Sequence, residues 1–104
     1  MIYNLTVTDK AEELLDNLIY YLVECLKNKQ AGRHLMSMLE NVYKQLEENP
    51  FVYKECDDPY LNGLGYREAI VPEMNYIVIF EVDDDEVTIL GFFHQLENYS
   101  LKLR

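Results

Sequence analysis

The sequence predicts an α+β fold: an N-terminal strand and an antiparallel helical hairpin packed on a mostly antiparallel four-stranded sheet. Three observations support this prediction. Residues 1–8 alternate apolar and polar side chains, residues 9–49 contain two stretches of helical periodicity with a short connection, and residues 66–94 contain three strand-like segments. A strand, two helices and a run of strands in this order is typical of the α+β class.

The length and the apolar pattern limit the class of protein. A chain of 104 residues fits one domain with one hydrophobic core, so we treat residues 1–104 as a single unit. No apolar run approaches the roughly 20 residues of a membrane-spanning helix, and no signal peptide is visible. Cys25 and Cys56 have no spacing typical of a disulfide framework or a metal site. These features predict a cytoplasmic protein without a membrane partner.

The first strand and the first helix follow from a change of period. The segment MIYNLTVT alternates with period two, as a half-buried strand does. From Ala11 to Leu26 the apolar residues recur every three or four positions, which predicts an amphipathic helix. Asp9 with Glu12 three residues later fits the helix start, and Asn28 fits its exit.

A second helix is predicted from Ala31 to Leu46, again from apolar residues at helical spacing. The dipeptide Asn49-Pro50 ends it, because a proline excludes helical backbone at the preceding residue. The connection between the helices is so short that they must lie antiparallel. Residues 51–65 contain one proline and two glycines, and we expect an extended loop there.

Three strands complete the predicted sheet. The segment YREAIV is a short strand, and NYIVIFEV and VTILGFFH form a hairpin whose tip is the acidic sequence DDDE. The alternation in the middle segment predicts two faces. One face comprises Tyr76, Val78, Phe80 and Val82, and the opposite face comprises Ile77, Ile79 and Glu81.

Charge argues against one class of function. The chain has 9 basic and 19 acidic residues, a formal net charge of −10 at pH 7. Residues 1–54 hold 8 acidic and 6 basic residues, whereas residues 55–104 hold 11 and 3. Proteins neutralise nucleic-acid phosphates with clustered Lys and Arg side chains. We therefore expect no tight direct binding of nucleic acid.

Metal and cofactor sites are not predicted either. The acidic run from Asp83 to Glu86 lacks the alternate ligand spacing and the distal glutamate of a calcium-binding loop. The glycines of NGLG do not lie between a strand and a helix, so they do not form a phosphate-binding loop. We expect neither a metal nor a cofactor.

Three residues could carry chemistry. His94 ends the last predicted strand and Tyr99 follows five residues later; an imidazole and a phenol can transfer protons during RNA cleavage. Arg67 opens a predicted strand, from which its planar guanidinium could reach the open face of the sheet and bind a phosphate or a carboxylate. The structural alternatives are a backbone carbonyl as the partner of His94, packing of Tyr99 over the sheet edge, and an ion pair of Arg67 with one of the many nearby acidic residues, such as Glu68 or Glu81.

The order of these elements and several fixed residues resemble the RelE/ParE superfamily of type II toxin–antitoxin toxins. The matching positions cover nearly the whole chain: Thr8, Ala11, Leu15, Asn28, Ala31, Leu46, Asn49, Pro50, Gly65, Tyr66, Arg67, residues 75–83, residues 87–90, His94 and Tyr99. Their order and spacing together carry the resemblance. It looks closest to the ParE-like branch of plasmid stabilisation proteins, whose first two helices are long.

The resemblance implies a small toxin that a cognate antitoxin neutralises by wrapping its surface. ParE-like members are associated with poisoning DNA gyrase, whereas RelE-like members cleave mRNA on the ribosome with basic residues and a C-terminal tyrosine. If this chain is an endoribonuclease, the resemblance makes Arg67 the phosphate ligand, His94 the base and Tyr99 the acid.

The C-terminal motif departs from the family pattern. Superfamily members commonly end in H-x-R-R-x-Y, but here Leu96 and Glu97 replace the two arginines. Removing one group that stabilises developing phosphate charge costs on the order of 10²–10³ in rate, and an anion in its place should cost more. This change argues against an enzyme.

We therefore predict a ParE-like toxin that binds a protein target, with DNA gyrase as a candidate. An mRNA interferase and a non-toxic remnant that keeps antitoxin binding are the alternatives, and a homodimer is left open. The expected contact surface comprises apolar helix edges and the sheet face near Tyr66, Arg67 and Phe92. The negative charge predicts an antitoxin segment with more Lys and Arg than usual, because complementary potentials govern pairing.

Overall fold

Four strands form one mixed sheet in the computed structural model, which describes residues 2–103. The strand order is β1-β4-β3-β2; β1 pairs with β4 in parallel and the other pairs are antiparallel. The strands are β1 (Asn4–Val7), β2 (Arg67–Val71), β3 (Tyr76–Asp83) and β4 (Glu86–His94). The helices are α1 (Asp9–Tyr20), a π-helical turn (Tyr21–Cys25), α2 (Lys29–Glu48), a 3-10 turn (Pro50–Val52), α3 (Pro59–Gly63) and α4 (Tyr99–Lys102). The predicted α+β class is confirmed.

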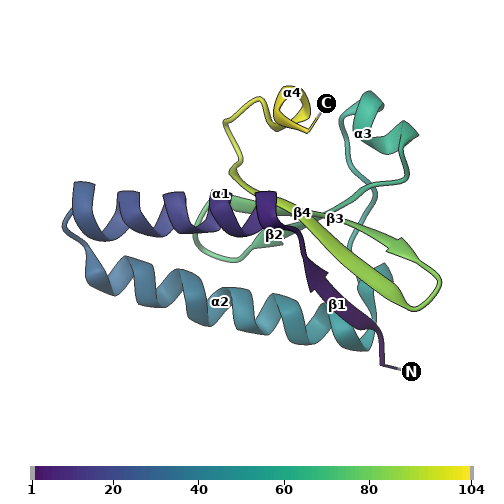
Figure 1. Ribbon diagram of the computed structural model, residues 1–104, viewed down its shortest axis with the longest axis horizontal. Coiled ribbons are helices and arrows are strands. Elements are labelled where there is room, and N and C mark those ends of the chain that lie inside the picture. Colours follow the sequence, from purple (N-terminus) through teal and green to yellow (C-terminus); the bar gives the residue numbers. More distant parts are fainter. Residues whose placement is uncertain (1, 104) are drawn as a thin grey trace.

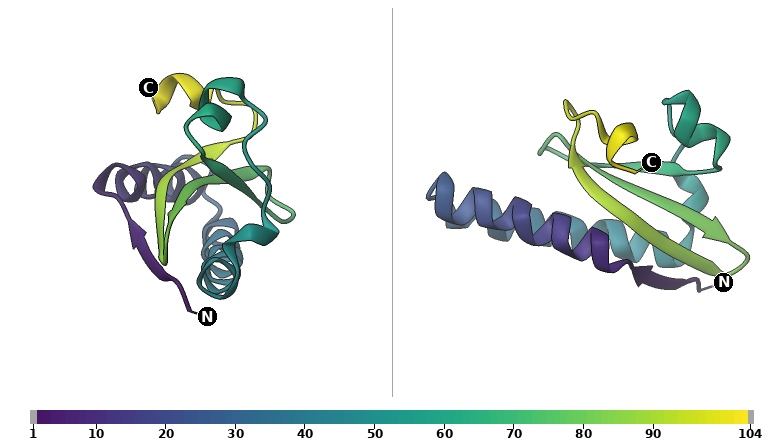
Figure 2. Two further views of the ribbon diagram at one scale, coloured as in Figure 1. Left: turned by 90° about the vertical axis from the view of Figure 1, so that its right-hand side faces the viewer. Right: turned by 45° about the horizontal axis from the view of Figure 1, so that its top comes forward.

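The helical hairpin covers one face of the sheet, and α3 and α4 cover the other (Figures 1 and 2). The helices α1 and α2 lie side by side and run in opposite directions, as their short connection requires. The helix α2 ends at Glu48, with Asn49 as its C-cap before Pro50, so the predicted stop is confirmed. No helix in the described part of the chain is long and apolar enough to cross a membrane.

The structure differs from the prediction at both helix caps of the first helix. Thr8, not Asp9, is the N-cap of α1, because its side chain accepts a hydrogen bond of 3.1 Å from the Ala11 amide. Asn28 does not end the first helix but starts the second, where its Oδ1 accepts from the Ala31 amide at 3.0 Å. Serine, threonine, aspartate and asparagine all serve as N-caps, so the sequence alone did not distinguish neighbouring candidates.

Residues 51–65 contain more structure than the extended loop that we predicted. Asp58 caps α3 by accepting a hydrogen bond from the Leu61 amide at 3.0 Å, and Pro59 occupies the first helical turn. An acidic residue followed by proline is a helix-start signal that the prediction overlooked. This short helix brings the buried Leu61 onto the sheet.

The two faces of β3 belong to two hydrophobic clusters. Val78 and Phe80 face the helical hairpin, whereas Ile77 and Ile79 face α3 and α4, and all four are at most 3% exposed. This is the alternation that the sequence predicted. The strand β3 is therefore covered on both faces. Each side chain of the adjacent strands lies either on the face of the helical hairpin or on the face of α3 and α4.

A β-bulge in β4 changes which residues face the helices. Ile89 lies opposite Phe80, but Gly91 lies opposite Ile79, so Leu90 is the extra residue. From Gly91 onward the even-numbered residues of β4 face the helical hairpin, instead of the odd-numbered ones. A Cβ atom added to Gly91 would lie 2.4 Å from the ring of Phe93, which is fully buried and cannot move aside.

We predict that Gly91→Ala lowers the free energy of unfolding by about 1–3 kcal/mol, the usual cost of overpacking a filled core. The matched control is Gly63→Ala in α3, where an added Cβ meets nothing within 4 Å. The control should change stability by less than about 1 kcal/mol. Urea unfolding of both variants measures this, and equal stabilities would contradict the proposed contact with Phe93.

Candidate functional site

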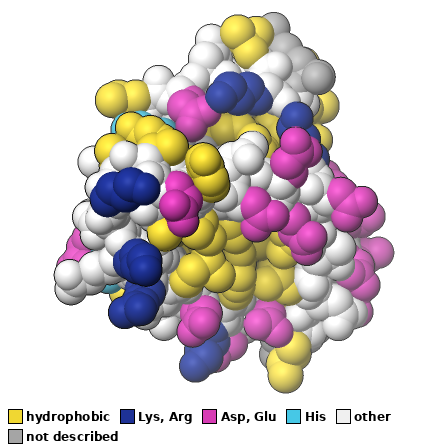
Figure 3. All heavy atoms as spheres, turned by 60° about the vertical axis from the view of Figure 1, so that its left-hand side comes forward, with side chains coloured by type: hydrophobic (Ala, Val, Ile, Leu, Met, Phe, Trp, Pro, Cys, Tyr) yellow, Lys and Arg dark blue, Asp and Glu magenta, His cyan; other side chains and the backbone are white. Residues whose placement is uncertain are grey.

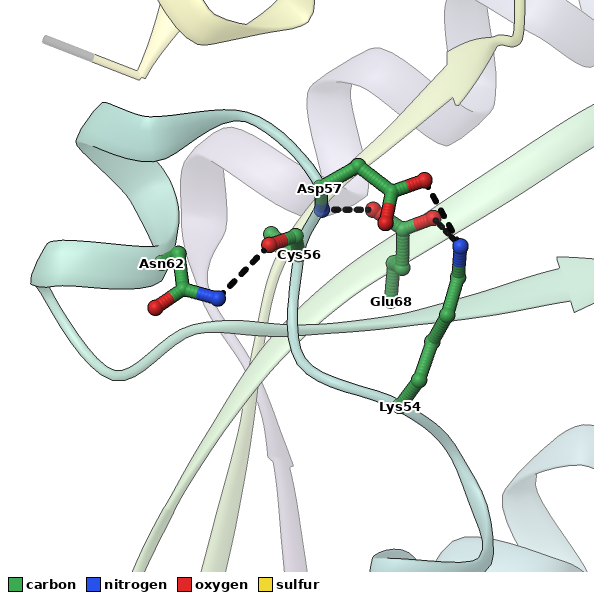
Figure 4. Close-up of polar contacts among 5 residues, drawn as sticks. All are labelled: Lys54, Cys56, Asp57, Asn62 and Glu68. Atoms are coloured by element: carbon green, nitrogen blue, oxygen red, sulfur yellow. Dashed lines mark hydrogen bonds and ion pairs between the residues drawn. The ribbon is translucent and has the colours of Figure 1, made fainter.

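A polar cluster lies on the sheet face that α3 and α4 cover. The chain segment after the 3-10 turn runs along the edge of β2: the Glu68 amide donates to the Lys54 carbonyl and the Cys56 amide to the Tyr66 carbonyl, both at 3.0 Å. This pairing places Lys54, Cys56 and Asp57 beside Glu68 (Figure 4). Two segments of the chain thus contribute to one site.

Glu68 is the centre of this cluster. Its residue is 5% exposed, and its Oε1 accepts a hydrogen bond of 3.2 Å from the Asp57 amide. The Lys54 Nζ lies 3.5 Å from the Glu68 Oε2 and 2.7 Å from the Asp57 Oδ2 (Figure 4). Two carboxylates therefore share one ammonium group, and the three side chains together carry a net negative charge when all are ionised.

The thiol of Cys56 is held in its protonated form. Burial raises its pKa to about 12, and the negative charge of Glu68 and its hydrogen bond with the thiol add to the effect. Because the thiolate is the nucleophilic species, this cysteine has no catalytic reactivity near neutral pH. Its carbonyl accepts a hydrogen bond of 3.0 Å from the Asn62 side chain, which fixes α3 to the loop.

Tyr99 stands on the same face, stacked on Phe93 with ring centroids 5.8 Å apart. Burial raises the pKa of its phenol, and the negative charge of Glu68 raises it further. The phenol is therefore protonated at neutral pH, in a neighbourhood that disfavours negative charge. A phosphate would meet the same unfavourable field.

His94 lies on the opposite face of the sheet. Its ring packs edge-on against Tyr76 at 5.6 Å, on the side of the helical hairpin. Its Nδ1 accepts a hydrogen bond of 3.1 Å from the Leu96 amide, rather than donating to a carbonyl as the structural alternative supposed. Its own amide donates to the Glu97 Oε1 at 3.0 Å. These contacts close the turn that leads to α4.

Arg67 does not reach the open face, so that expectation was wrong. It pairs with Phe80 and shares its helix-facing side. Its guanidinium donates to the Tyr53 carbonyl at 2.8 Å, lies 3.8 Å from the Glu55 Oε1 and covers the Phe51 ring at 4.9 Å. The structural alternative, an ion pair with a nearby acidic residue, is confirmed, and the residue is Glu55 rather than either of the two examples, Glu68 and Glu81.

The three proposed catalytic residues therefore lie apart. Tyr99 occupies one face of the sheet, and Arg67 and His94 the other. Along β3, the partners of Arg67 and His94 are Phe80 and Tyr76, about 13 Å apart at roughly 3.3 Å per residue. Their assignment as a catalytic set for RNA cleavage stays a prediction that this arrangement does not favour.

The predicted contact residues also divide between the faces. Tyr66 is half-buried and packs beside the cluster that includes Phe93, on the face of Glu68 and Tyr99. Phe92 is 3% exposed and packs on Tyr43 of α2, so its assignment to an exposed contact surface was wrong. The bulge in β4 is the reason, because it turns Phe92 toward the helices.

The helical hairpin itself offers an apolar groove. A cavity of about 430 Å³ lies between α1 with its π-helical turn and α2; its apolar walls are Ile19, Val23 and Met36. Lys29 and Arg33 line the same groove, as does Glu40. Figure 3 shows a broad hydrophobic area on the face where the hairpin loop comes forward, bordered by carboxylates and, on one side, by basic side chains. Such an area is typical of a protein-binding surface.

The fold and the sequence match one protein family. A family model described as "ParE toxin of type II toxin-antitoxin system, parDE" matches residues 5–99. The chain belongs to this family. The predicted membership of the RelE/ParE superfamily is thereby confirmed. A comparison with curated protein sequences finds no match.

Solved toxin structures share the fold of this ParE-family chain. A chain of the chromosomal ParDE system from P. aeruginosa is 19% identical, with a TM-score of 0.72 over 89% of this chain and 96% of that one. The RelBE2 toxin–antitoxin complex from Mycobacterium tuberculosis gives 20% identity and 0.61, covering 90% and 99%. The YoeB dimer from Staphylococcus aureus gives 14% and 0.61, covering 89% and 97%.

The environment of the two cysteines predicts different reactivity. Cys25 is exposed, whereas Cys56 is buried with a pKa raised to about 12. Iodoacetamide should therefore alkylate Cys25 in the native protein and leave Cys56 unmodified, with rates that differ by about 100-fold or more. Peptide mass mapping at pH 8 measures both sites, and unfolding in urea should equalise them. Rapid native labelling of Cys56 would contradict the buried site.

Glu97 gives a prediction about pH. Partial burial would raise the pKa of its carboxyl, but hydrogen bonds from Lys102 and the His94 amide outweigh burial and lower the pKa below its usual 4.5. The ionised form therefore stabilises the fold above about pH 4.5, and this contribution disappears as the pH falls through the lowered value. Glu97→Gln should cost about 0.5–1 kcal/mol at pH 7 and progressively less in acid.

Urea unfolding of this variant and the wild type between pH 7 and pH 2.5 measures that difference. Glu13→Gln, at an exposed position of α1, controls for the general effect of removing one negative charge. A cost that stays constant down to pH 2.5 would show that Glu97 acts through its shape and not through its charge.

Proposed function

We propose that this chain is the toxin of a type II toxin–antitoxin pair and that it inhibits growth by binding a protein target, DNA gyrase being the first candidate. The observation that carries this proposal is the charge around Tyr99. Where an RNA-cleaving relative requires cations, this chain presents the buried Glu68, paired with the single ammonium group of Lys54 that it shares with Asp57.

The chemistry of RNA cleavage supports the same choice. An attack on a phosphodiester builds negative charge on the phosphate, which cationic groups must stabilise. Here Arg67 is bound to Tyr53 and Glu55 on the other side of the sheet. Glu97 occupies a position at which the superfamily ending that the sequence resembles has arginine. An mRNA interferase therefore remains the weaker alternative.

The groove on the helical hairpin supports an antitoxin as regular partner. An antitoxin segment that covered the apolar area of Figure 3 would bury hydrophobic surface that the free toxin leaves in water. The relatives from P. aeruginosa and M. tuberculosis belong to a ParDE and a RelBE2 toxin–antitoxin system. A remnant that has lost toxicity but keeps this groove is the other alternative.

Inducible expression in bacteria tests the proposal. We expect growth arrest that co-expression of the protein encoded by the adjacent gene relieves, and inhibition of gyrase supercoiling by the purified protein. Primer extension on cellular mRNA should show no new cuts. Tyr99→Phe keeps the stacked ring and removes the hydroxyl, so toxicity should change by less than about twofold if the phenol has no chemical role.

Two outcomes would overturn this ranking. New mRNA cuts that Tyr99→Phe and Arg67→Lys both abolish would establish the interferase, and the lysine variant retains the positive charge that packs on Phe51. Normal growth despite high levels of folded protein would favour the non-toxic remnant. Circular dichroism of each variant confirms that the fold is intact.

A further inference from the structure

A hollow lies between the loop after α2 and the free edge of β2. Its volume is about 360 Å³, and its lining residues are Val52, Tyr53, Lys54, Glu68 and Ile70. We call this site the Glu68 hollow. Two apolar side chains at its rim are strongly exposed: Val52 at 56% and Ile70 at 48%. The hollow thus combines an apolar entrance with a nearly buried carboxylate.

The edge of β2 beside this hollow has unpaired backbone groups. Because the Glu68 amide donates outward to the Lys54 carbonyl, the amides and carbonyls of Glu68 and Ile70 point away from β3. Within the described chain, no backbone group bonds to the amide or the carbonyl of Ile70 on that side. A free strand edge binds an extended peptide through such groups.

We propose that the Glu68 hollow takes a lysine or arginine side chain from an extended segment of the antitoxin. The identity of the partner rests on the function proposed above. The aliphatic part of the incoming side chain would pass between Val52 and Ile70, and its charged end would meet Glu68. The backbone of the same segment would bond to the amide and the carbonyl of Ile70.

Charge complementarity favours this occupant. Glu68 and Asp57 share one ammonium group, that of Lys54, so a second cation completes the neutralisation of the site. The Lys54 side chain is 54% exposed and lies nearer to Asp57, at 2.7 Å, than to Glu68, at 3.5 Å. It can therefore keep Asp57 as its partner while an incoming cation takes Glu68. A phosphate or an acidic peptide would increase the unpaired negative charge.

A random peptide library displayed on phage and selected against the purified protein tests the proposal. Selected peptides should share one basic residue with apolar neighbours. A synthetic peptide of the selected sequence, labelled with fluorescein, should then bind Glu68→Gln about 10- to 100-fold more weakly than the wild type, because a charge-assisted contact is lost. Replacing the basic residue of an arginine-containing peptide by citrulline should weaken binding to the wild type similarly and to Glu68→Gln hardly at all.

Two variants make the result independent of folding. Glu68→Gln retains an acceptor for the Asp57 amide, and thermal unfolding checks that it is folded. Lys54→Gln removes the internal competitor and should tighten peptide binding by up to about fivefold, a gain that unfolding cannot produce. Glu13→Gln is the control for total charge and should leave the affinity unchanged.

Each contrary outcome is distinct. Selected peptides without a basic residue, or equal affinity for wild type and Glu68→Gln, would overturn the proposal. Self-association that Glu68→Gln weakens, measured by sedimentation, would identify a second copy as the occupant and overturn the assignment to an antitoxin. Peptide binding uses isolated protein, so it can succeed even if the growth assay rejects the toxin function, and the two failures are distinguishable.

Discussion

β3 is buried on both of its faces from Tyr76 to Phe80. This burial determines which face each side chain of the paired strands β2 and β4 occupies. The helical hairpin packs on Val78 and Phe80, and α3 and α4 pack on Ile77 and Ile79. Fully burying one such side chain stabilises a fold by about 1.5–3 kcal/mol. Turning part of β3 over would expose these side chains, so each of them is fixed to its own face of the sheet. The register of β2 and β4 against this strand therefore decides which polar residues can meet.

This constraint separates the residues that a ribonuclease would need together. Arg67 pairs with Phe80 and therefore lies on the face of the helical hairpin. Glu68, the next residue, pairs with Ile79 and lies on the face that α4 covers. An arginine at position 68 would lie on the face of Tyr99, but this position holds the carboxylate of Glu68. Two carboxylates, those of Glu68 and Asp57, therefore lie on the face of Tyr99, where RNA cleavage would require positive charge, and the proposed cationic partner fits that charge.

Much of the fold was predictable because it depends on local pattern. The alternation in β3, the two helical stripes and the Asn49-Pro50 stop are properties of contiguous residues, and each prediction was confirmed. The sheet face on which the Arg67 side chain lies was not predictable, because Ala69 and Ile70 are both apolar and β2 therefore shows no alternation of apolar and polar residues. The bulge at Leu90 was not predictable for a similar reason. Phe92 and Phe93 are both apolar, so the sequence is compatible with a register with the bulge and with one without it.

The candidate site was less predictable than the fold. Lys54 and Asp57 are close in sequence, but their contact with Glu68 requires residues 54–56 to run along β2. Neither periodicity nor charge counting indicates such a pairing. The family resemblance indicated Arg67, His94 and Tyr99, and of these three Tyr99 shares a face with the acidic cluster.

Glu97, at a position where the superfamily ending that this sequence resembles has arginine, also has a structural role. Its carboxylate accepts the His94 amide and pairs with Lys102, and so joins the end of β4 to the helix that carries Tyr99. An arginine there could not accept that hydrogen bond, because a guanidinium has donors alone. Glu97 therefore supplies no positive charge for RNA cleavage, and it forms a contact that holds α4 over the sheet. A toxin that recognises a protein, as proposed above, needs no such positive charge and benefits from the contact, since a rigid surface loses less entropy on binding.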